Sequence, residues 1–428
     1  MNGPEAGSGR PAASGRPAAS GRFAALGPGI LFAAAAIGVS HVVQSTRAGA
    51  VYGLAMVALI VVIGIVKYPA IRFGSQYTAA TGKSLPENYI DQGWWAVSLY
   101  LVTQLLTVWF VLAAIAVTTA GLVLTVFDLA MSPVALTGWL MAGTALLLTI
   151  GHYRWLERVG KALVFVLVVM VVVAAGAAVP KIDWSVGNFA FERIDVPLLL
   201  FVVAMAGWLP TPVDASILTS VWTSAKLKAS GTGISSTHAR FDFNLGYVTA
   251  MVLAVGFLLL GIAVMHEPGI APRDSPPEFA AQVIALFTET VGGWSFYLIG
   301  AAAIAAMFST LLAAMDGYPR QFAYAFAGLR GTEAPRWFVP ALIWACALGS
   351  FTLLAVLLTS FTRFIDLTTT LGFVMAPIYA LLNHRAMTGA EVPLAYRPSR
   401  GLRLWSLAGL VVLAAASIIY LYVRFIHG

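Results

Sequence analysis

Residues 205–216 read MAGWLPTPVDAS, and they interrupt an otherwise apolar segment near its middle. Pro210 and Pro212 each remove a backbone donor, and Gly207 lowers the cost of leaving the helical conformation. We therefore expect this segment to be a broken helix. Asp214 would lie in the first turn of its second half, where the positive end of a helix favours a carboxylate.

The first apolar segment carries a matching interruption. Residues 37–47 read IGVSHVVQSTR, which places Gly38 and several polar side chains near its middle. Backbone carbonyls freed in hydrocarbon are costly unless they face protein, water or a ligand. Two broken helices, five segments apart, are typical of inverted-repeat transporters with a substrate site between the breaks. Simple kinks in two packed helices remain the alternative.

The composition predicts a membrane protein. Of 428 residues 60% are hydrophobic and 10% charged, whereas about 25% are charged in soluble domains. Apolar stretches of about 20 residues, the length that crosses a bilayer, recur along the chain. We expect a disordered cytoplasmic tail, residues 1–22, and one transmembrane domain, residues 23–428. The expected spans are 28–51, 53–73, 94–125, 133–151, 159–179, 194–225, 241–265, 293–317, 337–359, 362–383 and 403–425.

Between two of these spans, residues 277–290 have one apolar face and predict a short helix at the membrane interface. The distribution of Lys and Arg sets the orientation. With a cytoplasmic N-terminus and an external C-terminus at the cell membrane, most basic residues fall inside. The external side then holds only Lys181, Arg193, Arg273, Arg363 and Arg424. The net charge of +7 is thus a topology signal, which excludes nucleic acid as a partner and leaves the lipid bilayer.

Several motifs resemble the natural resistance-associated macrophage protein (Nramp) family of metal-ion transporters over most of residues 23–385. They are Leu26–Gly29, Ala48–Ala50 before Tyr52-Gly53, Ala80–Leu85, Asp242 with Asn244, and Ser309-Thr310. The resemblance implies an all-α, leucine-transporter-type fold. In that fold spans 1–5 and 6–10 form a 5+5 inverted repeat, helices 1 and 6 are broken, and an eleventh helix is appended.

The sequence departs from the family where the metal binds. The family's Asp-Pro-Gly-Asn in helix 1 is replaced here by residues 38–41, GVSH, and its Met-Pro-His in helix 6 by residues 209–211, LPT. The aspartate and the thioether are absent, so preference for soft metals should be lost. Only the carbonyl position at Ala206 and the broken geometry carry over. The family's proton route on helices 1, 3, 6 and 9 also lacks its ionisable side chains, so we expect transport without that coupling.

Two residues are the leading candidates for a cation ligand. Asp214 at membrane depth is costly and usually has a function or a partner, although it could simply cap a helix. His41 could ligate a metal ion together with Asp214, or could be structural. The expected substrate site comprises Gly38, Ser40, His41, Gln44, Ala206, Trp208, Leu209, Thr211 and Asp214, with the carbonyls around Ala36 and Ile37. The expected gating residues are Asp242, Asn244, Asp366 and Thr369.

These patterns predict a secondary transporter that moves a small cation, in the first place a divalent metal ion, by alternating access. A transporter of a small organic solute, an amino acid or an amine, is the alternative. An enzyme is not expected, because no nucleophile–base pair or nucleotide loop is visible, and no cofactor is expected. The single Cys346 excludes a disulfide within one chain. The sequence does not indicate an oligomeric state.

Overall fold

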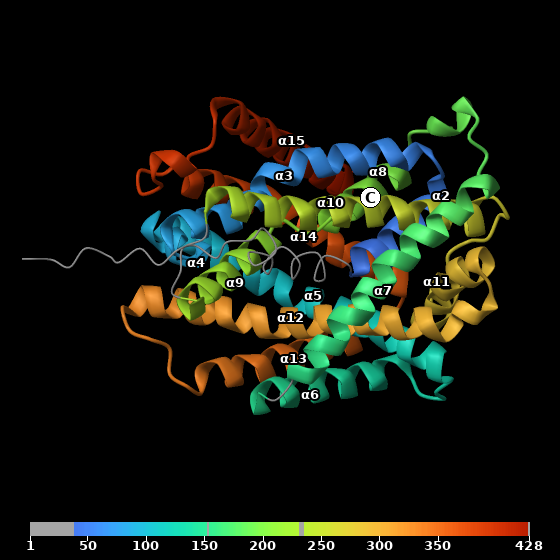
Figure 1. Cartoon of the computed structure of the whole chain (residues 1–428), viewed down its shortest axis with the longest axis horizontal. Helices are drawn as coiled ribbons and strands as arrows, with labels where there is room; N and C mark the ends of the chain where they lie inside the picture. Colours follow the sequence, from blue (N-terminus) through green and yellow to red (C-terminus); the bar gives the residue numbers. More distant parts are fainter. Residues whose placement is uncertain (1–37, 152–153, 231–234, 427–428) are drawn as a thin grey trace, which may run out of the picture.

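The computed structural model of the protein describes residues 38–151, 154–230 and 235–426. In these ranges the backbone forms helices, turns and loops without any strand. Most helices lie side by side along the long direction of the molecule (Figure 1). The short helix α4 (Leu85–Asp91) lies at one end of this bundle and α11 (Pro276–Val291) at the other. We call them the α4 end and the α11 end.

Each of the eleven expected spans overlaps a helical segment among the described residues, although residues 28–37 of the first span lie outside them. Nine of the described helices are long and apolar enough to cross a membrane. The other two spans are the interrupted ones. In chain order the segments are η1 and α2 (Ser40–Ser45, Thr46–Tyr52), α3 (Ala55–Thr81), α5 (Trp94–Phe127), α6 (Pro133–Ile150), α7 (Arg154–Ala178), α8 and α9 (Val196–Trp208, Ala215–Ser230), α10 and η4 (Ser236–Gly261, Ile262–His266), α12 (Phe296–Arg330), α13 (Phe338–Leu357), α14 (Phe361–Thr388) and α15 (Arg400–Ile426).

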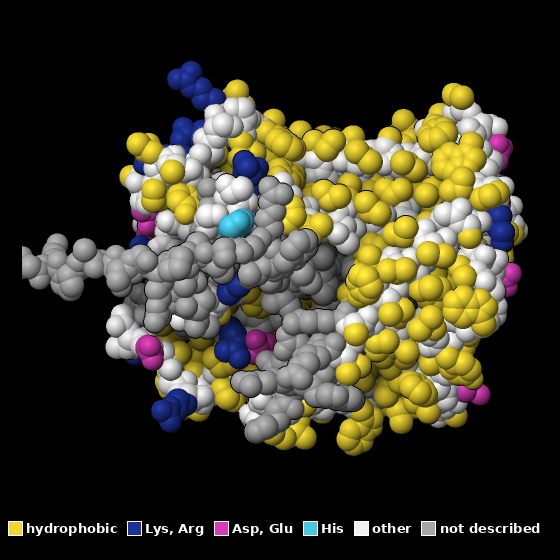
Figure 2. Space-filling model, viewed as in Figure 1, with side chains coloured by type: hydrophobic (Ala, Val, Ile, Leu, Met, Phe, Trp, Pro, Cys, Tyr) yellow, Lys and Arg dark blue, Asp and Glu magenta, His cyan; other side chains and the backbone are white. Residues whose placement is uncertain are grey.

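The bundle presents an apolar flank. Where the described residues are visible, hydrophobic side chains cover most of the face between the two ends, and charged side chains gather near the ends (Figure 2). This is the surface that a bilayer requires. The helix expected at residues 277–290 is α11, but its apolar residues Phe279, Val283, Leu286 and Phe287 are buried in the protein, where α11 packs on α5 and α7. The expectation that this face meets the membrane interface was therefore wrong.

The break between α8 and α9 spans residues 209–214, where both prolines lie. Its position depends on close packing of α8 against α14. A Cβ added to Gly207 would lie 1.8 Å from the carbonyl oxygen of Thr369, so only glycine allows this approach. The opposing segment η1 is a π-helical turn, a distortion that is frequent at functional sites.

The last helix, α15, compensates for two prolines inside other helices. Pro69 in α3 leaves the carbonyl of Ile65 without its helical donor, and the indole of Trp405 donates to this oxygen at 2.9 Å. Pro377 in α14 does the same to the carbonyl of Phe373, which accepts a bond from Ser417 at 3.4 Å. Helix α15 thus fastens α3 and α14 at their bends.

Candidate functional site at the helix break

Lys67 of α3 occupies the end of α8. Its ammonium donates to the carbonyl oxygens of Ala206, Gly207 and Leu209, at 2.9, 3.1 and 3.0 Å. The residue is 0% exposed. An ammonium has three donors, so these bonds saturate it. The carbonyls belong to the negative end of α8, which attracts a cation. We call these three oxygens the carbonyl cage.

Asp214 lies at the opposite side of the same break. It is 7% exposed, and its Oδ2 accepts a hydrogen bond of 3.1 Å from the hydroxyl of Tyr318 in α12. The carboxylate also interacts with the backbone at Ala215, where α9 begins, and is attracted electrostatically to Lys67. Each helix end at the break is therefore matched by a side chain of opposite charge.

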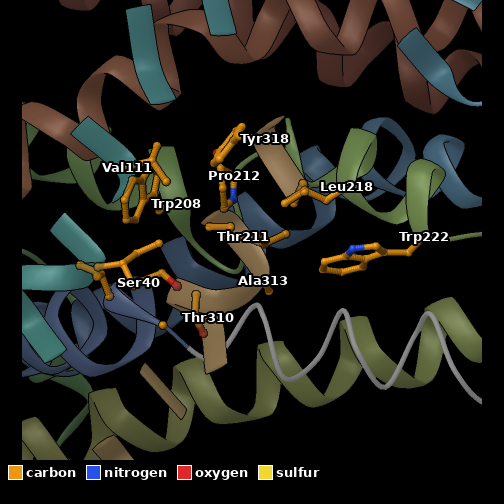
Figure 3. Close-up of a pocket in the computed structure, with 15 residues that line it drawn as sticks. Ser40, Val111, Trp208, Thr211, Pro212, Leu218, Trp222, Thr310, Ala313 and Tyr318 are labelled. Carbon is orange, nitrogen blue, oxygen red and sulfur yellow. The ribbon is translucent and has the colours of Figure 1, made fainter. Parts of the chain in front are cut away.

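A cavity of about 70 Å³ adjoins the break. Four of the predicted residues line it: Gly38, Ser40, Trp208 and Thr211. Its other lining residues are Val39, Val111, Ile115, Pro212, Ala215, Leu218, Trp222, Thr310, Ala313, Ala314 and Tyr318. In Figure 3, Trp208 and Val111 lie on one side of this space and Leu218 and Trp222 on the other. Tyr318 both lines the cavity and donates a hydrogen bond to Asp214, so it connects the carboxylate to this space.

His41 does not join Asp214 in this structure. Its Nε2 bonds to the carbonyl oxygen of Ala250 in α10 at 2.9 Å, and its Nδ1 to the hydroxyl of Ser40 at 3.0 Å. A carbonyl only accepts, so in the neutral ring Nε2 carries the proton and Nδ1 accepts. Both nitrogens are then engaged by the protein. These contacts favour the structural alternative for this histidine, and its expected metal role stays a prediction.

A second cluster joins η1 and α2 to α14. Arg47 forms a two-pronged ion pair with Asp366, with contacts of 2.6 and 2.9 Å. Gln44 donates to Asp366 and to Thr369, at 3.0 Å each, and accepts from Arg47 at 3.3 Å. Helix α14 begins at Phe361, which is bonded to Asp274 just before α11. The cluster thus lies on the α11 end's side of the break.

The remaining predicted residues lie elsewhere. Asp242 is buried near the start of α10, and Asn244 accepts a bond of 2.7 Å from the hydroxyl of Tyr68. Neither lines the cavity. Ala36, Ile37 and residues 1–22 lie outside the described part of the chain.

Sequence reasoning missed Lys67, Arg47 and Tyr318. The signal for Lys67 was visible: a lone lysine within the apolar residues 55–81, close to Pro69, is costly in a membrane and requires a partner. Arg47 lies inside the polar stretch 37–47, but its partner Asp366 is distant in sequence. Tyr318 had no signal of its own.

The described residues contain no group of three or more His, Cys, Asp or Glu side chains that could hold a metal ion. Whatever cation binds at the break would meet carbonyls, hydroxyls and Asp214. This donor set consists of oxygen atoms, which suit hard cations such as magnesium, calcium and manganese.

Comparison with known proteins places this architecture. The profile of the natural resistance-associated macrophage protein-like family matches residues 29–423. The chain belongs to this family. It is also 29% identical, over 404 residues, to the uncharacterized protein PM0681 of Pasteurella multocida (strain Pm70), an alignment that covers 92% of this chain and 91% of that protein. Nramp-like proteins are membrane transporters, so this multi-pass chain is a transporter and not an enzyme.

Solved structures show the same fold. A manganese transporter of Eremococcus coleocola is 13% identical, with a TM-score of 0.68 and coverage of 94% of this chain and 88% of that one. The amino-acid-bound transporter MhsT, in complex with L-phenylalanine, gives 15% identity, a TM-score of 0.62 and coverage of 95% and 99%. The nucleobase-cation-symport-1 family transporter Mhp1 is 17% identical, with a TM-score of 0.56 and coverage of 93% of this chain and 92% of that one. The leucine-transporter-type fold predicted for this Nramp-like chain is confirmed.

Proposed function

We propose that this Nramp-like protein is a secondary transporter that carries a small cation, a divalent metal ion, across the cell membrane by alternating access. The observation that carries the proposal is the carbonyl cage beside Asp214. Three backbone oxygens converge on one positive charge at the break of helix 6, next to a buried carboxylate. Such a group of oxygens attracts cations and repels anions. Because Lys67 fills the cage itself, we place the cargo beside it, in the adjoining cavity that Ser40, Thr211 and Thr310 line.

The size of the cavity supports an ion as cargo. Pockets for drug-sized ligands are about 300–1,000 Å³, several times larger than the 70 Å³ here. That space suits one small ion with part of its hydration shell. The hydroxyls of Ser40, Thr211 and Thr310 line it and are oxygen ligands. No sulfur atom lies among the described residues that line it, which favours hard cations over cadmium or copper(I).

The cluster around Asp366 is proposed as the gate on the external side. It bridges the outer half of helix 1 to helix 10, between the break and the α11 end. The gate is closed when Arg47 and Asp366 are paired. Opening the site to the outside requires that these bonds break, so their strength sets the fraction of outward-open protein.

We propose further that the α4 end and the N-terminus both lie on the cytoplasmic side of the membrane. Basic side chains gather near the α4 end in the view of Figure 2, in agreement with the positive-inside pattern. A reporter fused after Gly428 should be external. A cytoplasmic reporter would require an even number of spans.

Coupling is proposed to differ from the family's proton route. Helices α5 and α13 carry no Asp, Glu, His, Lys or Arg, so they offer no chain of titratable groups leading from the break. Proteoliposomes that contain a pH-sensitive dye test this point. Substrate-dependent acidification that disappears in Asp214→Asn would contradict it.

The test of the cargo uses purified protein in liposomes loaded with a metal-sensitive dye, with manganese, magnesium or calcium added outside. Uptake of at least one ion by the wild type is expected. Asp214→Asn should abolish it while the protein remains monodisperse and folded. Asp316→Asn, which breaks an exposed pair with Arg320 on α12, is the matched control and should retain uptake. Folded wild type that moves none of these ions refutes the metal proposal.

One observation favours the second candidate, a small amine or amino acid. The aromatic side chains of Trp208, Trp222 and Tyr318 line the cavity, and aromatic rings attract organic cations. Competition in the same liposomes distinguishes the candidates. Uptake of an amine or amino acid without uptake of any metal ion would establish the second.

A further inference from the structure

Lys67 places a positive charge where a free ion would otherwise be needed to hold the end of α8. We propose that the carbonyl cage is a binding site for a monovalent cation, occupied in this protein by its own tethered ammonium. Removal of that ammonium would create a site for a free ion of similar size, ammonium or potassium. This inference concerns ion binding in the resting structure and does not depend on which cargo the protein carries.

The distances define the size of the site. The three oxygens lie 2.9, 3.1 and 3.0 Å from the nitrogen of Lys67. Magnesium and calcium need oxygen ligands at about 2.0–2.1 and 2.3–2.6 Å, so each oxygen would have to move inward by several tenths of an ångström or more. Potassium-selective channels coordinate their ion with backbone carbonyls, as this cage does. In its present shape the cage fits a larger monovalent ion.

The surroundings explain why an ion is required. Gly207 and Leu209 are buried, and the C-terminal carbonyls of α8 have no helical donors because the chain turns away at Pro210. A buried acceptor left without a donor costs about 1–3 kcal/mol. Asp214 provides the counter-charge. It attracts Lys67 electrostatically, although the three ammonium donors bond to the carbonyls and not to the carboxylate. Without a cation, the cage would have no donor, and Asp214 would keep only its bond from Tyr318 and its contacts with the backbone at the start of α9.

The proposal has a consequence for the wild type. A tethered ammonium fills this site at any external salt composition, so the protein needs no sodium or potassium to complete the break. Substitution of Lys67 exchanges this built-in cation for one taken from solution. The altered protein should then respond to monovalent ions to which the wild type is indifferent.

The experiment measures melting temperature for detergent-purified Lys67→Met and wild type. Each is held at constant ionic strength in the chloride of potassium, ammonium, sodium, lithium or choline. Methionine keeps most of the apolar part of the side chain, but it is one heavy atom shorter and lacks the charge and the donors, so the position of the ammonium is vacated. We expect the melting temperature of Lys67→Met to rise saturably with potassium and ammonium, less with sodium, and not at all with choline. The wild type should show no such difference.

A second variant separates charge from hydrogen bonding. Lys67→Gln supplies two neutral N–H donors, so it should stay less stable than wild type because neither the charge nor the third bond is restored. Equal stability of Lys67→Gln and wild type would overturn the proposal, since the site would then need no cation. The proposal also fails if Lys67→Met melts alike in every salt, or folds in none, because a free ion then does not replace the ammonium. None of these results depends on transport, so failure of this proposal can be distinguished from failure of the proposed transport function.

Discussion

Replacing Asp366 with asparagine should open the proposed external gate. In the wild type, Oδ2 of Asp366 accepts from one guanidinium nitrogen of Arg47 at 2.9 Å, and Oδ1 accepts from the other at 2.6 Å. In Asp366→Asn one oxygen becomes an amide nitrogen, so whichever way the amide lies a donor faces a donor. Gln44 can still donate to the remaining oxygen. The substitution thus removes the charge and one prong while it preserves the shape.

The burial of the pair sets the size of the effect. The side chain of Arg47 is 11% exposed and that of Asp366 is 33% exposed. Breaking a fully buried pair costs about 3–5 kcal/mol, whereas exposed pairs contribute about 0.2–1 kcal/mol. Because the exposure of this pair is intermediate, we expect the ion pair to stabilise the closed gate by about 2 kcal/mol. Since 1.4 kcal/mol is a factor of about ten, the outward-open population should rise roughly 30-fold.

A cysteine in the cavity reports that population. Val111→Cys places a thiol of similar size among the lining residues, in a background where the native buried Cys346 is replaced with alanine. In sealed vesicles with the external face outward, a membrane-impermeant thiol reagent reaches this cysteine only through the open external side. Its rate of modification should increase roughly 30-fold when Asp366→Asn is added, because the rate follows the open fraction.

The control is Asp316→Asn in the same background, which breaks an exposed pair and should leave the rate unchanged. If Asp366→Asn changes the rate by less than about threefold, the ion pair does not hold the gate closed. A rise that is equally large for Asp316→Asn would point to general loosening of the protein instead.

Other substitutions give further checks. Gly207→Ala should prevent α8 from approaching α14 and should destabilise the protein by more than the roughly 1–3 kcal/mol typical of overpacking, which thermal unfolding would measure. Gly176→Ala, where the added Cβ meets open space, should be neutral in the same measurement. His41→Gln should lower stability by about 1 kcal/mol yet retain uptake, whereas loss of uptake in a protein of unchanged stability would support the ligand role. Trp405→Phe leaves the Ile65 carbonyl without its donor, and denaturant or thermal unfolding should show a loss of about 1 kcal/mol. Calorimetry with hard and soft metal ions should show no selective binding of cadmium or copper(I), and tight selective binding of either would contradict an oxygen-only site.

The break of helix 6 was predictable because its causes are local. Pro210, Pro212 and Gly207 act on their own backbone, and the structure places the interruption at residues 209–214. The spans were predictable for a similar reason, since each apolar stretch has the length that a bilayer demands. The side chain that fills the break was not, because Lys67 is about 140 residues away in sequence from the carbonyls it meets. That contact depends on how α3 packs against α8.

His41 and α11 illustrate the same limit. The sequence places polar atoms on His41 but does not reveal that the ring turns toward Ala250 of α10 rather than toward the cavity. The apolar face of α11 was correctly recognised, yet lipid and protein offer the same apolar partner to Phe279 and Phe287. Periodicity identifies a face that must be covered, and tertiary packing decides what covers it.

The hydrogen bond from Trp405 of α15 to α3 also has a consequence for synthesis of the protein. Trp405 lies 340 residues after the carbonyl of Ile65 that it satisfies. At about 5–20 residues per second, the ribosome needs roughly 20 to 70 s to deliver that indole after the bend in α3 has been synthesised. During this interval the carbonyl oxygen of Ile65 must accept a hydrogen bond from water or from another helix. A chain that ends before residue 400 never gains the indole donor for the Ile65 carbonyl, so we expect it to be recognised as incompletely folded and degraded.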